Sequence, residues 1–184
     1  MPSLSGKTIA FLVAPEGVEQ AELVEPWEAV IEAGGTPRLV STQEGGIQAF
    51  EHLDRAGIYL ADTTVELGAV DGYDGLVLPG GVANPDYLRT QPAAVTFAKS
   101  FFDSGKPVAA ICHAPWLLIE AGVVDGRTMT SWPSLRTDLS NAGAHWVDEP
   151  VRVCSDGPNT LITSRKPQDI PLFNKAFVAE FAGA

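Results

Sequence analysis

The chain has 184 residues and a formal net charge of −11, with 45% hydrophobic and 19% charged residues, the ordinary composition of a globular protein. This length favours one domain, spanning residues 1–184, that is large enough to bury a core. The acidic balance argues against binding to phosphate backbones, so we expect no nucleic-acid partner.

The two cysteines lie at positions 112 and 154, without the spacing of a disulfide framework or a zinc site. We therefore expect a reducing compartment, and neither a metal nor a cofactor. The N-terminal segment lacks the charge pattern of a signal peptide, and the apolar run that follows ends by Pro15, too short to span a bilayer. We expect a cytoplasmic protein that does not act at a membrane.

Along the chain, short apolar runs alternate with segments of helical periodicity. The apolar runs predict buried strands at 8–13, 37–41, 75–78, 108–111, 151–153 and 161–163. Helices are predicted at 19–33, 92–102, 113–121, 134–142 and 168–181. The stretch 45–60 is expected to hold short strands and turns. This alternation predicts an α/β fold with a doubly wound, mostly parallel sheet and helices on both faces.

The most informative residue is Cys112, which ends an apolar strand and is followed directly by His113. Ala110 and Ala114 are small enough for a sharp strand-to-helix turn. This is the pattern of a nucleophile elbow with cysteine in place of serine. A thiol placed there, near a helix N-terminus, is favoured as the thiolate. The alternative is a buried structural cysteine, which the adjacent histidine makes the weaker interpretation.

Three loops follow predicted strand ends: residues 16–19, the pair Gly80 and Gly81, and the turn at Cys112. In doubly wound sheets, ligands bind beyond the carboxyl ends of the strands, near a switch in strand order. We therefore expect these loops to meet at one edge of the sheet. Glycines there can expose backbone N–H groups to an oxyanion.

Several other polar residues are interpreted as structural or solvent-exposed. Glutamates that recur every third residue partly mark a solvated helix face, and these are Glu16, Glu19, Glu22, Glu25 and Glu28. Cys154 is assigned a structural role. His52 and His145 have no metal-ligand spacing and are assigned surface or loop positions.

The segment 105–113 (GKPVAAICH) resembles the cysteine segment of the PfpI-type intracellular proteases, within the ThiJ/PfpI superfamily. The sequence Leu78-Pro79-Gly80-Gly81 is similar to the glycine loop of that family, and residues 126–144 and 161–165 resemble its later segments. The resemblance covers nearly the whole chain. It implies a flavodoxin-like α/β sandwich of the class I glutamine-amidotransferase type, and dimers that sometimes assemble into hexamers.

The resemblance also implies roles for individual residues. Cys112 would be the nucleophile and His113 the base or acid. Glu19 matches the superfamily glutamate that hydrogen-bonds the thiol. The backbone N–H groups of Gly81 and His113 would bind an oxyanion. Asp86 is the best match to an acidic residue that reaches the histidine of a neighbouring subunit, although it is shorter than the family glutamate.

Elementary electrostatics adds a hypothesis about Glu19. An ionised carboxylate beside the sulfur would raise the thiol pKa, whereas a protonated one donates a hydrogen bond to the thiolate and lowers it. We therefore expect Glu19 to be largely protonated and Cys112 to be largely thiolate.

These residues predict a cysteine-dependent enzyme that attacks a carbonyl carbon and serves in stress protection. Its reaction is either peptide or amide hydrolysis, or conversion of small aldehydes and ketones, as in the glyoxalase and deglycase activities reported for the superfamily. A peptide or a small carbonyl compound is the expected substrate, and the sequence does not separate the two. Trp132, where the proteases often carry tyrosine, weighs against proteolysis.

A different class of function is a redox sensor, in which Cys112 is oxidised to sulfenic or sulfinic acid with little turnover. A class I glutamine amidotransferase would require a His-x-Glu pair downstream of the elbow. His145 is the histidine available there, and it lacks that partner.

Overall fold

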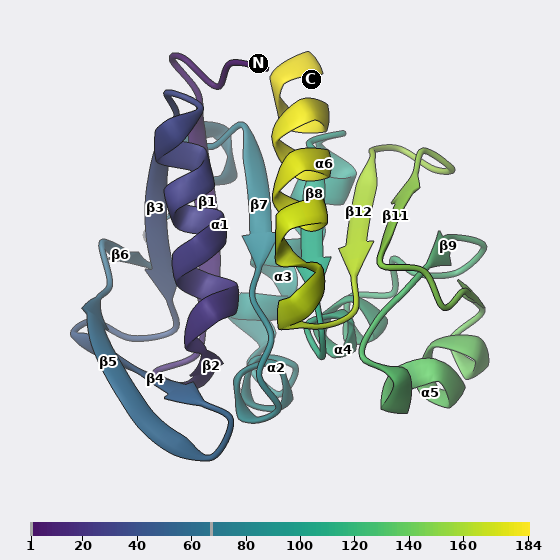
Figure 1. The fold of residues 1–184 in the computed structure, drawn as a ribbon, viewed down its shortest axis with the longest axis horizontal. Coiled ribbons are helices and arrows are strands. Elements are labelled where there is room, and N and C mark those ends of the chain that lie inside the picture. Colours follow the sequence, from purple (N-terminus) through teal and green to yellow (C-terminus); the bar gives the residue numbers. More distant parts are fainter. Residues whose placement is uncertain (1, 67) are drawn as a thin grey trace.

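The computed structural model describes residues 2–66 and 68–184, and its centre is a seven-stranded sheet (Figure 1). The strand order is β11-β12-β8-β7-β1-β3-β6. These strands are β1 (Thr8–Val13), β3 (Thr36–Ser41), β6 (Thr63–Thr64), β7 (Gly75–Leu78), β8 (Val108–Ile111), β11 (Val151–Cys154) and β12 (Leu161–Ser164). All neighbours are parallel except β11 and β12, which are antiparallel. The predicted α/β fold with a mostly parallel sheet is therefore confirmed.

Helices cover both faces of this sheet. Helices α1 (Gln20–Glu32) and α6 (Ile170–Gly183) lie side by side on one face, and α3 (Pro92–Asp103) and α4 (Pro115–Glu120) pack on the other (Figure 1). Within the described residues, no helix combines the length and the apolar character needed to cross a bilayer.

The strand β1 shows why the core has two halves. Ile9, Phe11 and Val13 pack with α1 and α6, whereas Ala10 and Leu12 pack with α3 and α4. Successive side chains of a strand point to opposite faces of the sheet, so a strand covered on both faces has no polar positions. This explains the continuous apolar run in the sequence.

The stretch from 45 to 60, which was expected to hold short strands and turns, forms a β-hairpin. Strands β4 (Gly46–Glu51) and β5 (Asp54–Leu60) pair antiparallel, and β4 also pairs parallel with β2 (Glu16–Glu19) to give a separate three-stranded sheet. The loop predicted at residues 16–19 is thus a short strand. The hairpin packs beside the start of α1 because β2 leads directly into that helix.

Other short elements complete the chain. The helix expected at 134–142 is α5 (Arg136–Asn141), preceded by a 3-10 turn, Pro133–Leu135. Helix α2 (Ala83–Leu88) was not expected, because its Asn-Pro-Asp sequence is typical of a turn. Its proline lies in the first turn, where no intrahelical N–H bond is lost. The remaining elements are β9 (Thr128–Met129), β10 (His145–Trp146) and the 3-10 turns Val70–Gly72 and Pro167–Asp169.

The strand order reverses at β1. The chain leaves β1 through α1 to β3 on one side, and it later returns to β7 on the other side of β1. Loops that leave adjacent strands in opposite directions open a crevice at the carboxyl ends of those strands. The segments after β1, β7 and β8 meet there, as the sequence predicted.

Asn84 of α2 joins two of these segments. Its side chain is buried, and its Oδ1 accepts a hydrogen bond from Ala14 N (2.7 Å), just after β1. Its Nδ2 donates to Pro79 O (2.9 Å) and Gly80 O (3.0 Å) in the loop after β7. The side chain therefore fixes the glycine loop relative to the end of β1.

Replacing this side chain should destabilise the fold. Asn84→Ala leaves buried backbone groups without partners, which we expect to lower the free energy of unfolding by about 3 kcal/mol. Denaturant titration monitored by circular dichroism measures this change. Asn141→Ala, at an exposed position of α5, is the matched control and should stay within about 0.5 kcal/mol of wild type. Equal losses in the two variants would contradict the role assigned to Asn84.

Candidate active site

Cys112 lies in a sharp turn between β8 and α4. Its φ of 63° is in the left-handed region that L-residues rarely adopt. Its N–H donates to Ser164 O (3.0 Å) at the end of β12, and its carbonyl accepts from Trp132 N (2.9 Å). These two backbone bonds fix the turn, and they leave the side chain, 5% exposed, at the base of a cavity.

The glutamate that contacts the thiol is Glu22, not Glu19. Glu22 is fully buried on α1 and lies on the same helix face as Pro26 and Val30. The assignment of Glu19 to this contact is therefore wrong, and so is the interpretation of Glu22 as part of a solvated face. The helix starts at residue 20, and its rotation turns position 22 inward, toward the sheet edge.

The hydrogen bonds around Glu22 indicate where its proton lies. Oε2 accepts from Gly80 N (2.8 Å), whereas Oε1 has no conventional hydrogen-bond partner among the described residues. Burial, more than any other cause, raises the pKa of Glu22 to about 8, so the carboxyl is mostly protonated at neutral pH. A proton on Oε1 can be donated to the Cys112 sulfur.

Glu19 has a different place in the same region. Its carboxylate accepts a hydrogen bond from His52 N (3.0 Å), in the turn between β4 and β5. The next residue, Gln20, accepts from Gly57 N (2.7 Å) and Tyr59 Oη (3.0 Å). The start of α1 thus holds the β4–β5 hairpin against one wall of the cavity, and His52, which lies in an exposed turn as expected, lines that wall.

The resting thiol is not the expected thiolate. Burial raises the pKa of Cys112, and the Glu22 carboxylate raises it further when it ionises. The backbone N–H groups of Gly81 and His113 act in the opposite direction. These N–H groups therefore approach the sulfur from the two loops named in the sequence, but burial has the larger effect on the thiol pKa.

His113 is the second group in contact with the sulfur. Its Nδ1 lies 3.1 Å from Cys112 Sγ. The ring packs between Trp116, at a centroid distance of 5.1 Å, and Trp132, which stacks on it at 5.5 Å. Burial lowers the pKa of His113 to about 4, so the imidazole is neutral at pH 7. With its proton on Nε2, the ring can accept the thiol proton at Nδ1.

Position 80 requires glycine because three groups converge on it. A Cβ there would lie 2.7 Å from Cys112 Cβ, 2.5 Å from Glu22 Oε2 and 2.8 Å from Ile111 O. Gly81 has a φ of 81°, and a Cβ on it would collide with Gly17 O. The glycine loop therefore brings backbone N–H groups closer to the thiol than any side chain would allow.

The cavity above the sulfur has a volume of about 590 Å³. Apolar side chains supply much of its wall: Phe50, Leu53, Val82, Trp132 and Pro167. Asp86 of α2 also lines it, but no hydrogen bond or ion pair joins Asp86 to His113 within the described chain. The expectation that Asp86 reaches the histidine of another subunit stays a prediction.

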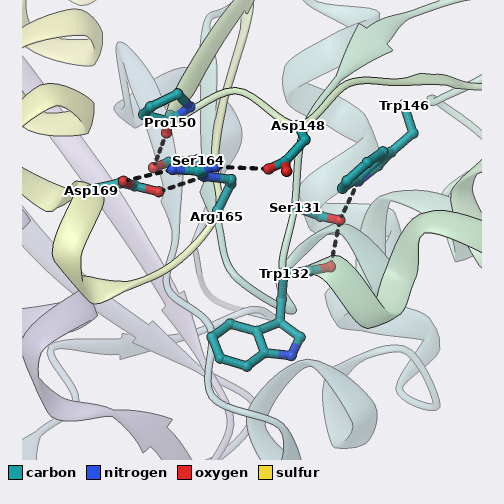
Figure 2. A network of polar contacts seen from close by, with 8 residues as sticks. All are labelled: Ser131, Trp132, Trp146, Asp148, Pro150, Ser164, Arg165 and Asp169. Carbon is teal, nitrogen blue, oxygen red and sulfur yellow. Dashed lines mark hydrogen bonds and ion pairs between the residues drawn. The ribbon is translucent and has the colours of Figure 1, made fainter.

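A polar network supports the wall that carries Trp132 (Figure 2). Trp146 Nε1 donates to Ser131 Oγ (3.0 Å), which donates in turn to Trp132 O (2.9 Å). Figure 2 shows the Trp132 ring directed away from this network. The network therefore fixes the backbone of Trp132 and leaves its ring free to stack on His113.

The same view shows how the end of β12 is held. Arg165 lies between two carboxylates, with Nη1 2.7 Å from Asp148 Oδ1 and Nε 2.9 Å from Asp169 Oδ2 (Figure 2). Ser164 Oγ donates to Pro150 O (2.7 Å). Ser164 O accepts the N–H of Cys112. These contacts therefore help to hold the turn at Cys112 in place.

A family model described as "DJ-1/PfpI family" matches residues 7–180. The chain belongs to the DJ-1/PfpI family. It is 39% identical to General stress protein 18 of Bacillus subtilis over 95% of this chain and 97% of the relative. It is also 39% identical to Deglycase PfpI of Pyrococcus furiosus, over 92% of this chain and 96% of the relative.

Among solved structures of the DJ-1/PfpI family, Drosophila melanogaster DJ-1beta is similar to this chain. The TM-score is 0.82 at 30% sequence identity, over 97% of this chain and 91% of that one. The family assignment made from the cysteine and glycine segments is confirmed.

The buried carboxyl of this DJ-1/PfpI site has a consequence for stability. A raised pKa means that the folded chain keeps a proton that the unfolded chain releases, so stability falls as pH rises from about 4.5 to about 8. Glu22→Gln removes this titration. Between pH 5 and pH 8, we expect the free energy of unfolding of wild type to fall by several kcal/mol relative to that of the variant. The slope should be about 1.4 kcal/mol per pH unit.

Denaturant titrations at several pH values measure this difference. Glu25→Gln, at an exposed position of the same helix, is the control and should show no such slope. A Glu22→Gln curve parallel to wild type would contradict the protonated state assigned to Glu22.

Proposed function

We propose that this DJ-1/PfpI-family chain is a cysteine-dependent enzyme that converts reactive carbonyl compounds, as a deglycase or glyoxalase, in protection against stress. The observation that carries the proposal is the 3.1 Å contact between Cys112 Sγ and His113 Nδ1 at the base of an open cavity. Relatives named deglycase and general stress protein support it.

The first step is addition of the sulfur to an aldehyde carbon. The thiol proton passes to His113 Nδ1 as the C–S bond forms and the C=O π bond opens, so the step does not require a free thiolate beforehand. The N–H groups of Gly81 and His113, which interact with the sulfur, would bind the developing oxyanion. Return of the proton from His113 to that oxygen gives a neutral hemithioacetal.

With an α-oxoaldehyde such as methylglyoxal, the reaction needs no external oxidant. A proton moves from the former aldehyde carbon to the adjacent carbonyl carbon through an enediol, which converts the hemithioacetal to a thioester. Water then releases the hydroxy acid and regenerates the thiol. One carbon is oxidised as its neighbour is reduced, so the electrons balance.

Peptide hydrolysis would use the same nucleophile and oxyanion donors. The volume of about 590 Å³ suits a small carbonyl compound or one modified side chain. The relatives named deglycase also favour carbonyl chemistry over proteolysis. We therefore propose a small carbonyl compound or adduct as the substrate.

The assembly is part of the proposal. Within the described chain, His113 has no carboxylate partner, while Asp86 borders the same cavity. An oligomer in which Asp86 of a second copy approaches His113 would supply that partner. A homodimer is the smallest assembly that allows this arrangement.

A redox-sensing function is the second candidate, and it is favoured by the donors around the sulfur. The protonated Glu22 and the N–H groups of Gly81 and His113 surround Cys112. The same donors could stabilise the oxygens of a sulfenic or sulfinic acid. This function would require oxidation of Cys112 without catalytic turnover.

Substitution of the cysteine tests the enzymatic proposal. We expect Cys112→Ala to lower kcat/KM for methylglyoxal at least 100-fold, because no other thiol faces the cavity among the described lining residues. Consumption of methylglyoxal and formation of lactate are both measured. Cys154→Ala removes the second cysteine, which lies outside the cavity. This variant is the matched control and should keep wild-type activity per folded molecule.

Intact-mass analysis after mild peroxide treatment separates the two candidates. Selective addition of oxygen at Cys112, in a chain that consumes neither methylglyoxal nor glycated peptide faster than Cys112→Ala, would refute the enzymatic proposal and support sensing. Turnover that depends on Cys112 supports the enzyme.

A further inference from the structure

Among the residues that the structure describes, the cavity above Cys112 is lined by acidic side chains and by no lysine or arginine. Among the described lining residues, the acidic groups near its mouth are Glu19 and Asp86. Glu22 at the base is mostly protonated at neutral pH, and His113 is neutral. His52 is the one other lining residue able to take up a positive charge.

Two arginines of neighbouring segments have partners elsewhere, and Lys166, which precedes the lining residue Pro167, is not itself among the described lining residues. Arg165 is paired with Asp148 and Asp169. Arg55 of β5 lies over the Phe50 ring at 5.9 Å and donates to Gln48 Oε1. Neither is a lining residue of the cavity, so a carboxylate bound near the sulfur would face two acidic side chains without an arginine partner.

The apolar walls increase the effect of these charges. Phe50, Leu53, Val82 and Trp132 line the space around the sulfur with apolar surface, which lowers the local dielectric below that of bulk water. Charges that interact across a region of lower dielectric are screened less than charges in water. An anionic ligand is therefore repelled, a neutral one is admitted, and an ammonium or guanidinium group is attracted.

We infer that this cavity selects neutral and cationic carbonyl ligands against anionic ones, and that Glu19 is a residue that determines this selectivity. The inference deepens the proposed function by naming its substrate class, and it rests on that function only for the reaction. Aldehydes without a negative charge match this preference, whereas oxoacids do not.

The charge preference can be measured without turnover. Methanethiosulfonates transfer their alkylthio group to the Cys112 sulfur: a disulfide bond forms, the S–S bond of the reagent breaks, and methanesulfinate and the thiol proton are released. We would compare a trimethylammonium-ethyl, a sulfonato-ethyl and a methyl reagent at pH 7, by intact mass and peptide mapping, with 2-mercaptoethanol as the reference thiol. The cation-to-anion rate ratio at Cys112 should exceed that of the reference thiol by about tenfold, the effect expected of one or two nearby charges.

Two substitutions locate the origin of the preference. Glu19→Gln keeps an oxygen that can accept the His52 N–H and removes the charge, so the ratio should fall by about threefold or more. Glu180→Gln removes the same charge from α6. Glu180 lies near Gly105 and Pro107, which precede β8 and are therefore at the opposite edge of the sheet from the cavity. This control should leave the ratio unchanged.

Three results would overturn the inference. The first is a ratio equal to that of 2-mercaptoethanol. The second is an equal effect of Glu180→Gln and Glu19→Gln, because the net charge of the whole chain would then be responsible. The third is no labelling of Cys112 by any reagent. A chain without turnover but with the expected ratio would refute the proposed function and leave the charge preference standing.

Discussion

Burial of the Glu22 carboxyl is the constraint on which the rest of the site depends. Among the described residues, the groups that shift its pKa include no lysine or arginine, so the carboxyl avoids the cost of a buried charge by keeping its proton. A protonated carboxyl still needs one donor and one acceptor. Gly80 N provides the donor, and the nearby Cys112 sulfur is the group able to serve as the acceptor.

This requirement connects three parts of the chain that are distant in sequence. Glu22 comes from the helix after β1, Gly80 from the loop after β7 and Cys112 from the turn after β8. The reversal of strand order at β1 brings these segments together. Asn84 adds a second connection between the first two. The fold therefore brings the three segments to the same place, and the hydrogen-bonding needs of the buried Glu22 carboxyl explain why they approach so closely.

Much of this arrangement could be predicted from the sequence because strand ends carry the chemistry. A buried strand that stops at Cys112, and another that stops before Gly80 and Gly81, must bring those residues to one sheet edge. The choice between Glu19 and Glu22 failed because it relied on motif position. The helical repeat held the signal, since Glu22 lies four residues before Pro26 and therefore on the buried stripe.

The pairing of the hairpin with β2 and the short helix α2 could not be predicted in the same way. Their stability comes from contacts with residues far away in the chain, such as Gly57 with Gln20, and no local periodicity encodes such contacts. The thiol pKa was missed for a related reason. The sequence locates a sulfur near a helix start, but the degree of burial that dominates its pKa is a property of the packed site.

The left-handed backbone at Cys112 has a consequence for how this protein can change. A non-glycine residue in that conformation costs about 1–3 kcal/mol, and glycine would remove most of the cost. Selection for thermal stability alone would therefore favour loss of the thiol at this position. Stabilised variants of this chain would therefore need to be screened for a retained thiol as well as for a higher melting temperature.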